Sequence, residues 1–79
     1  MDWNDYRMRC AELLIAVQNG DLAGDDACHR IHELAGRRHE TGTAEFMCGA
    51  IFERETNPET FRATIEKLES CEDENEFLA

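Results

Sequence analysis

Apolar residues recur at steps of three and four along most of the chain, and this spacing constrains its fold more than any other feature. In residues 2–19 the repeat consists of Trp3, Tyr6, Cys10, Leu13, Leu14 and Val17. Such spacing places the apolar side chains on one face of an α-helix. Residues that favour strands are few, with four isoleucines and one valine among 79 residues. The sequence therefore predicts an all-α fold.

Helix start and stop signals divide the chain into four predicted helices. Asp2 is a suitable N-cap for the first helix, and Gly20 stands where a left-handed residue would end it. Asn57 followed by Pro58 is a strong start signal for the last helix. The four predicted helices cover residues 2–19, 25–39, 43–56 and 57–71, and the last has an apolar stripe of Phe61, Ile65 and Leu68.

The short connections between these helices favour a small antiparallel bundle of about four helices. A chain of 79 residues has room for one domain. We expect residues 1–71 to form a single helical domain and residues 72–79 to form an acidic C-terminal tail.

Two glycines, Gly36 and Gly49, lie inside predicted helices, where glycine costs about 1 kcal/mol relative to alanine. One interpretation is a helix weakened at these positions and stabilised by packing. The other is a close helix crossing, either within the chain or across a dimer. The sequence favours neither.

The charge of the chain is strongly negative and unevenly distributed. The formal net charge is −10. Residues 1–39 hold seven acids and five bases, for −2, whereas residues 40–79 hold eleven acids and three bases, for −8. A nucleic-acid backbone or an anionic membrane surface would repel such a polyanion, so neither is expected to be a partner.

The acidic C-terminal half predicts a docking surface for a protein partner with a basic surface. An alternative is a solvated helix face that only keeps the protein soluble. We also expect Phe52 to belong to an exposed apolar contact patch, because it lies off the main apolar stripe of its helix. The candidate partner-binding residues are Glu59, Glu66, Glu69, Asp73, Glu76 and Phe52.

The cysteines and histidines give only a weak metal signal. Cys28 and His32 stand four residues apart, one helical turn, and His39 follows about 10 Å further along the same side. A structural zinc site needs four ligands, and paired Cys-x-x-Cys spacing is absent. We expect no metal site, with Cys28, His32 and His39 as weak candidates, and we expect the four cysteines to be reduced.

Enzymatic activity and a cofactor are not expected either. The sequence has no glycine-rich phosphate loop, and a bundle of this size offers little shielding from water. The longest apolar run, residues 13–17, is far shorter than a membrane span of about 20 residues, and no signal peptide is recognisable. A cytoplasmic location is therefore expected.

These observations favour a non-enzymatic acidic protein that docks on, and inhibits, a basic protein that handles nucleic acid. Small acidic single-domain chains are frequent among accessory proteins of phages and mobile elements, including anti-CRISPR proteins. That association rests on size and charge, without a shared motif. The alternatives are a small zinc-stabilised helical module and a homodimeric helical regulator.

Overall fold

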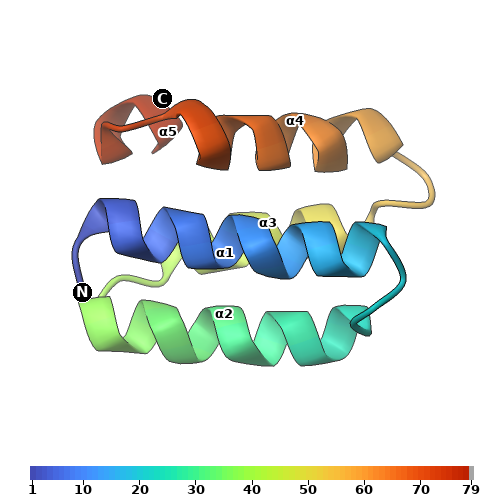
Figure 1. Ribbon diagram of the computed structural model, residues 1–79, viewed down its shortest axis with the longest axis horizontal. Helices are drawn as coiled ribbons and strands as arrows, with labels where there is room; N and C mark the ends of the chain where they lie inside the picture. Colours follow the sequence, from blue (N-terminus) through green and yellow to red (C-terminus); the bar gives the residue numbers. More distant parts are fainter. Residues whose placement is uncertain (79) are drawn as a thin grey trace.

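The computed structural model describes residues 1–78 and is all-helical in this range, as predicted. Four long helices form the bundle: α1 (Trp3–Gln18), α2 (Gly24–Arg38), α3 (Gly42–Phe52) and α4 (Pro58–Ser70). A short fifth helix, α5 (Glu74–Leu78), follows. Consecutive long helices run in opposite directions (Figure 1). Within residues 1–78, no helix combines the length and the apolar character needed to cross a membrane.

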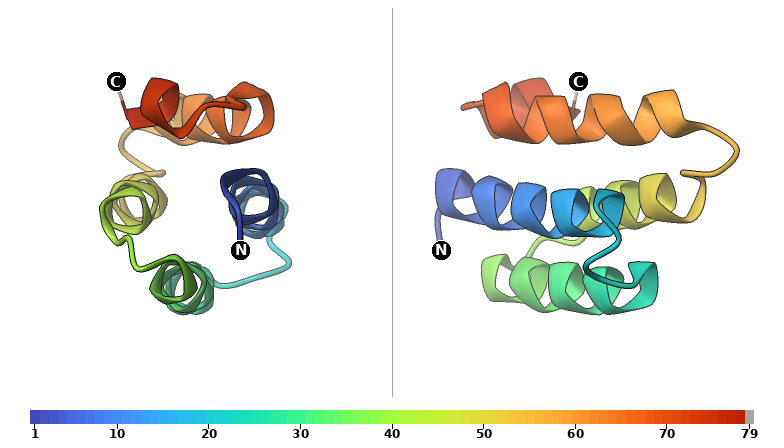
Figure 2. Two further views of the ribbon diagram at one scale, coloured as in Figure 1. Left: turned by 90° about the vertical axis from the view of Figure 1, so that its left-hand side faces the viewer. Right: turned by 45° about the vertical axis from the view of Figure 1, so that its right-hand side comes forward.

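The four long helices surround a single core. Seen from one end of the bundle, α1 and α3 lie on either side, with α2 below them and α4 with α5 above (Figure 2). Each long helix packs against the next in the chain, and α1 also packs against α4. As a result, α2 and α4 lie on opposite sides of the molecule.

Buried residues of all four long helices supply the core. The fully buried large side chains include Tyr6, Leu14, Ile31, Met47, Ile51 and Leu68. Burial of one such side chain contributes about 1.5–3 kcal/mol relative to exposure. All three stripe residues predicted for α4, Phe61, Ile65 and Leu68, are buried.

The ends of α1 are the predicted ones. Asp2 is the N-cap, and its Oδ1 accepts a hydrogen bond of 2.8 Å from the Asp5 amide. Gly20, beyond the helix, has a φ of 80°, a left-handed conformation that glycine adopts without steric cost.

The α2–α3 connection differs from the prediction, because a side chain outside α3 caps the helix. The Glu40 carboxylate accepts hydrogen bonds from the Gly42 amide and from Thr43 Oγ1, the latter at 2.7 Å. Tyr6 Oη and Thr43 Oγ1 are 2.9 Å apart in the core, which ties this cap to α1. The helix therefore begins at Gly42 rather than at Thr43.

The third helix is shorter than predicted, ending at Phe52 instead of near residue 56. Arg54 Nη1 donates a 2.6 Å hydrogen bond to the Ile51 carbonyl, and Thr56 Oγ1 donates to the Glu53 carbonyl at 3.1 Å. These side chains satisfy carbonyls that a longer helix would have paired internally.

Neither Gly36 nor Gly49 marks a close helix crossing within the described chain. A Cβ atom added at either position would meet nothing within 4 Å. The close approach is instead at Gly24, where an added Cβ would lie 3.0 Å from Ile51 Cγ2 and 3.1 Å from Arg54 Nη1. Gly24 therefore allows the start of α2 to pack against the end of α3.

Candidate acidic docking surface

The candidate surface is the outer face of α4, opposite its buried stripe. Asn57 caps the helix by accepting a 3.3 Å hydrogen bond from the Thr60 amide, and Pro58 begins the first turn. Glu59, Glu66 and Glu69 are exposed on this helix. These three residues are called the acidic row below.

Within residues 1–78 no base forms an ion pair with the acidic row, although Arg62 is exposed on the same helix, three residues after Glu59 and four before Glu66. The two ion pairs among residues 1–78 are Arg9 with Asp5 and Arg38 with Glu74, neither of which involves the row. Three further bases, Arg9, Arg30 and Arg37, line a groove of about 570 Å³ between α1 and α2. The outer face of α4, with three glutamates and Arg62, thus keeps an excess of negative charge that is accessible to solvent and partners.

A buried arginine fixes the C-terminal end of α4 against α1. Arg7 is only 8% exposed, and its Nη1 donates to the carbonyls of Leu68 at 2.7 Å and Glu69 at 2.9 Å. Its Nε donates to Asn4 Oδ1 at 2.9 Å. The last carbonyls of a helix lack internal donors and carry partial negative charge, so they suit a guanidinium. The backbone of Glu69 is held while its side chain remains exposed.

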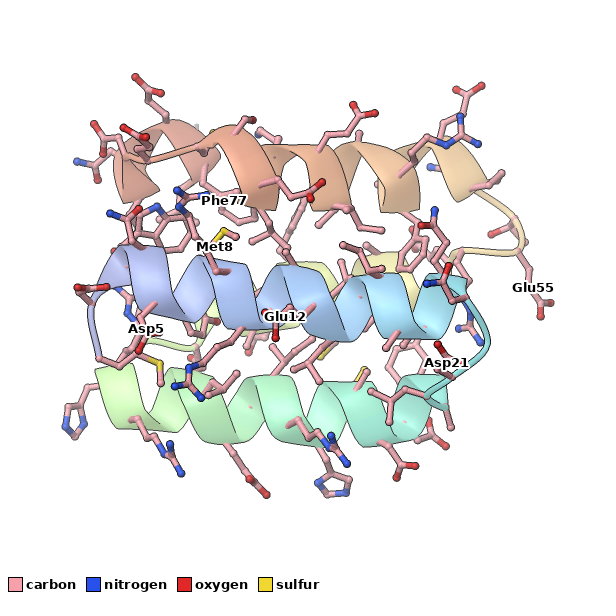
Figure 3. The ribbon with its side chains drawn as sticks, viewed as in Figure 1. Asp5, Met8, Glu12, Asp21, Glu55 and Phe77 are labelled. Carbon is pink, nitrogen blue, oxygen red and sulfur yellow. The ribbon has the colours of Figure 1, made fainter. Side chains whose placement is uncertain are left out.

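The residues expected as an acidic tail contain α5, which packs on the core through Phe77. This side chain is 4% exposed and lies between α5 and α1 (Figure 3). Its ring centroid is 5.4 Å from that of Trp3 and 5.9 Å from that of Phe46, the latter edge-on. Trp3 Nε1 donates a 2.9 Å hydrogen bond to the Cys71 carbonyl at the end of α4.

Two polar contacts hold α5, one from α2 and one from α4. Arg38 of α2 forms a two-pronged ion pair with Glu74, with N–O distances of 2.6 and 3.1 Å. The Arg38 guanidinium also lies over the Tyr6 ring at 4.8 Å. Lys67 Nζ donates to the Phe77 carbonyl at 3.2 Å. These contacts make α5 a packed element of the bundle.

The acidic candidates near α5 differ in what they do locally. Asp73 is exposed, but its Oδ1 accepts a 2.9 Å hydrogen bond from the Asn75 amide, so it also begins α5. Glu76 is exposed in the first turn of α5. The structure thus gives Asp73 a structural role, while Glu76, like the acidic row, faces solvent.

Phe52 lies apart from the acidic row. It is 65% exposed and lines a groove of about 430 Å³ between α2 and α3. The other lining residues are Asp25, Cys28, His29, His32 and Cys48. Because α2 and α4 lie on opposite sides of the bundle, the structure does not join Phe52 and the acidic row into one surface.

The weak metal candidates are only partly brought together. Cys28 and His32 share the α2–α3 groove, whereas His39 is the exposed C-cap of α2, with a φ of 58°. Within residues 1–78, no cluster of three or more His, Cys, Asp or Glu residues is arranged to hold a metal ion. This finding does not favour the zinc-stabilised alternative.

The cysteines are free, and two of them are poor nucleophiles or metal ligands near neutral pH. Burial raises the pKa of the Cys10 thiol to about 12. Burial and the adjacent Cys28 thiol raise the pKa of Cys48 to about 12. Since the thiolate is the reactive form, these environments keep both thiols protonated.

Three comparisons with known proteins give no further indication of function. No protein-family model, curated protein or solved structure matches the chain. The functional argument therefore rests on the surface chemistry of the bundle.

Proposed function

We propose that this protein is a non-enzymatic acidic binding protein that docks on a basic protein partner through the outer face of α4. The observation that carries this proposal is the acidic row. Glu59, Glu66 and Glu69 are exposed without an ion pair, on a helix whose end is held by Arg7. Charges of one sign along a packed helix attract an oppositely charged surface and steer its approach.

The spacing of the acidic row can be compared with the charge spacing of a nucleic acid. With a helical rise of 1.5 Å per residue, Glu66 lies about 10 Å along the axis from Glu59 and about 4.5 Å from Glu69. Duplex DNA presents one phosphate charge per about 1.7 Å of axis. The row is too sparse to imitate a duplex, but it suits competition for lysines and arginines that otherwise hold nucleic acid.

The proposal therefore includes inhibition of a protein that handles nucleic acid. Occupation of its basic surface by α4 would exclude the phosphate backbone from that surface. Size and charge are also in keeping with an accessory protein of a phage or mobile element, of the anti-CRISPR kind, acting in the cytoplasm. Asp73 and Glu76 extend the negative charge beyond the end of α4.

Affinity capture from a lysate of the native host, with the protein immobilised, tests the proposal. We expect the wild type to retain a basic protein that duplex DNA displaces, and the Glu66→Lys, Glu69→Lys variant to lose it. The matched control is Glu12→Lys, Glu33→Lys, which has the same net charge but leaves the acidic row intact. The proposal would be contradicted if duplex DNA did not displace the captured protein, or if both double variants retained that protein equally.

A further inference from the structure

Two cysteine side chains meet where α2 packs against α3. Cys28 of α2 is 8% exposed and Cys48 of α3 is 6% exposed, and both line the groove of about 430 Å³ between these helices. Burial is the main cause of the raised pKa of Cys48, and a hydrogen bond between its side chain and that of Cys28 is the next. The two sulfur atoms are therefore neighbours, on helices that lie side by side (Figure 2).

The register of the two helices explains this meeting. They run in opposite directions (Figure 1), and a Cβ atom added at Gly24 would lie 3.0 Å from Ile51 Cγ2. Cys28 stands four residues after Gly24, and Cys48 stands three residues before Ile51, so each is one helical turn further along. The next contact of the antiparallel pair is thus between the two cysteines. A disulfide needs Cα atoms within about 7 Å of each other, and the close approach that Gly24 allows favours such a distance.

The other two cysteines are placed differently. Cys10 is 0% exposed, and burial raises the pKa of its thiol to about 12. Cys71 is the C-cap of α4, on the opposite side of the bundle from α2. Among the described residues, neither of these cysteines lines the α2–α3 groove. A small oxidant in that groove therefore meets Cys28 and Cys48 together.

We propose that Cys28 and Cys48 form a site of reversible oxidation, at which hydrogen peroxide converts the two thiols to a disulfide that links α2 to α3. The Cys28 sulfur attacks one peroxide oxygen, which gives a sulfenic acid and releases one water. The Cys48 sulfur then attacks the Cys28 sulfur, and the sulfenic hydroxyl leaves with the Cys48 proton as a second water. Two thiols and one peroxide give one disulfide and two waters, and two electrons pass from sulfur to oxygen. This inference goes beyond the proposed docking function.

The surroundings of the two thiols set the order of these steps. A pKa of about 12 keeps Cys48 protonated near neutral pH, so it is a poor first nucleophile. Part of this raised pKa comes from the charge of a Cys28 thiolate, and that contribution disappears once Cys28 is a sulfenic acid. The second step also joins side chains that are already neighbours, and such proximity raises the effective concentration of the attacking group. Cys28 is therefore oxidised first, and Cys48 completes the disulfide.

The disulfide closes a loop of the chain that contains the α2–α3 connection. Such a bond restricts the unfolded chain more than the folded bundle, so it stabilises the fold that already exists. We expect the oxidised protein to melt at least about 5 °C above the reduced protein. A thiol reductant should return the melting temperature to that of the reduced protein.

Treatment of the full chain with hydrogen peroxide, followed by peptide mapping, tests the proposal. Trypsin alone leaves Cys10 and Cys28 in one peptide, so the digestion also includes a protease that cleaves before aspartate. Mass spectrometry should then show the Cys28 peptide joined to the Cys48 peptide, at the sum of their masses less two hydrogen atoms. Reduction should separate the two peptides.

Two cysteine variants give a matched comparison. Cys28→Ala should lose both the joined peptide and the rise in melting temperature on oxidation. Cys71→Ala should keep both, because Cys71 lies at the end of α4, away from the α2–α3 groove. Circular dichroism checks that each variant is folded, and if Cys28→Ala does not fold, the peptide map of the wild type decides alone.

The proposal would be overturned by a link between Cys10 and Cys48, by a link between two chains, by oxygen added to Cys28 or Cys48 without a link, or by no reaction at either residue. A linked protein that melts below the reduced protein would also overturn it. Each of these results would leave the docking proposal untouched, because the acidic row takes no part in this chemistry.

Discussion

Arg7 shows how one residue can fix the position of the acidic row. Its guanidinium is buried without a carboxylate partner in the described chain, and it bonds instead to the last carbonyls of α4. The sequence contained a signal for this role, because Arg7 is four residues after Trp3 and three before Cys10, on the apolar stripe of its helix. A long charged residue on such a stripe is buried only when it has partners, and the sequence does not show which carbonyls fold next to it.

Replacing Arg7 tests this link. Arg7→Met keeps the apolar stem but removes the donors to the Leu68 and Glu69 carbonyls, and we expect the free energy of unfolding to fall by about 2 kcal/mol. Arg62→Met, on the exposed surface of α4, should change it by less than about 0.5 kcal/mol. Urea denaturation measures both. Equal small effects would mean that Arg7 does not hold α4.

Cys10 predicts a loss of stability at alkaline pH. Burial raises its pKa to about 12 in the folded state, whereas a thiol in the unfolded chain ionises near about 8.5. At a pH between these two pKa values, the Cys10 thiol has lost its proton in the unfolded chain and keeps it in the folded protein. Ionisation of Cys10 therefore leaves the free energy of unfolding unchanged below pH ~8.5. Above that pH it lowers the free energy of unfolding by about 1.4 kcal/mol per pH unit.

Urea denaturation between pH 8 and 10, under reducing conditions, measures this effect. Cys10→Ala removes the titrating group, so its stability should decrease less steeply with pH than that of the wild type. Parallel slopes would show that Cys10 releases its proton as readily in the folded protein as in the unfolded chain.

At the scale of the elements, periodicity predicted the four long helices, because each buries a stripe long enough to be recognised. It did not predict α5. Five residues span little more than one turn, which is too short to show a helical period, and the acids around Phe77 indicate a solvated tail. The boundaries of α3 were missed for a related reason, since Glu40 and Arg54 satisfy its ends from outside the helix.

Phe77 tests whether α5 is a structural element of the bundle. Phe77→Ala removes a buried ring from contact with Trp3 and Phe46, so we expect a destabilisation of about 3 kcal/mol. Leu78→Ala, at a neighbouring position that is 54% exposed, should cost less than about 0.5 kcal/mol. Urea denaturation gives the two values, and the near-UV circular dichroism of Trp3 reports the loss of packing. A negligible effect of Phe77→Ala would make residues 72–79 a tail.

At the scale of the whole molecule, the fold places charged and apolar surface residues at separate positions, whereas the composition gives only their totals. The sequence located the excess of acids in the C-terminal half, and the exposure of Glu59, Glu66 and Glu69 follows from the buried stripe of α4. It did not show that Phe52 would face the α2 side or that three arginines would line the α1–α2 groove. Those placements depend on which helices become neighbours, and this is a property of tertiary packing.

The central claim is that the acidic row drives encounter with a basic partner. The most direct measurement is the association rate with the captured partner as a function of ionic strength. It compares the wild type, the Glu66→Lys, Glu69→Lys double variant and the charge-matched Glu12→Lys, Glu33→Lys double variant. We predict a wild-type rate that falls steeply with salt, a slower and less salt-dependent rate for the Glu66, Glu69 variant, and a smaller change for the control. A rate independent of salt and equal in all three proteins would contradict the claim and would mean that the acids only keep the protein soluble.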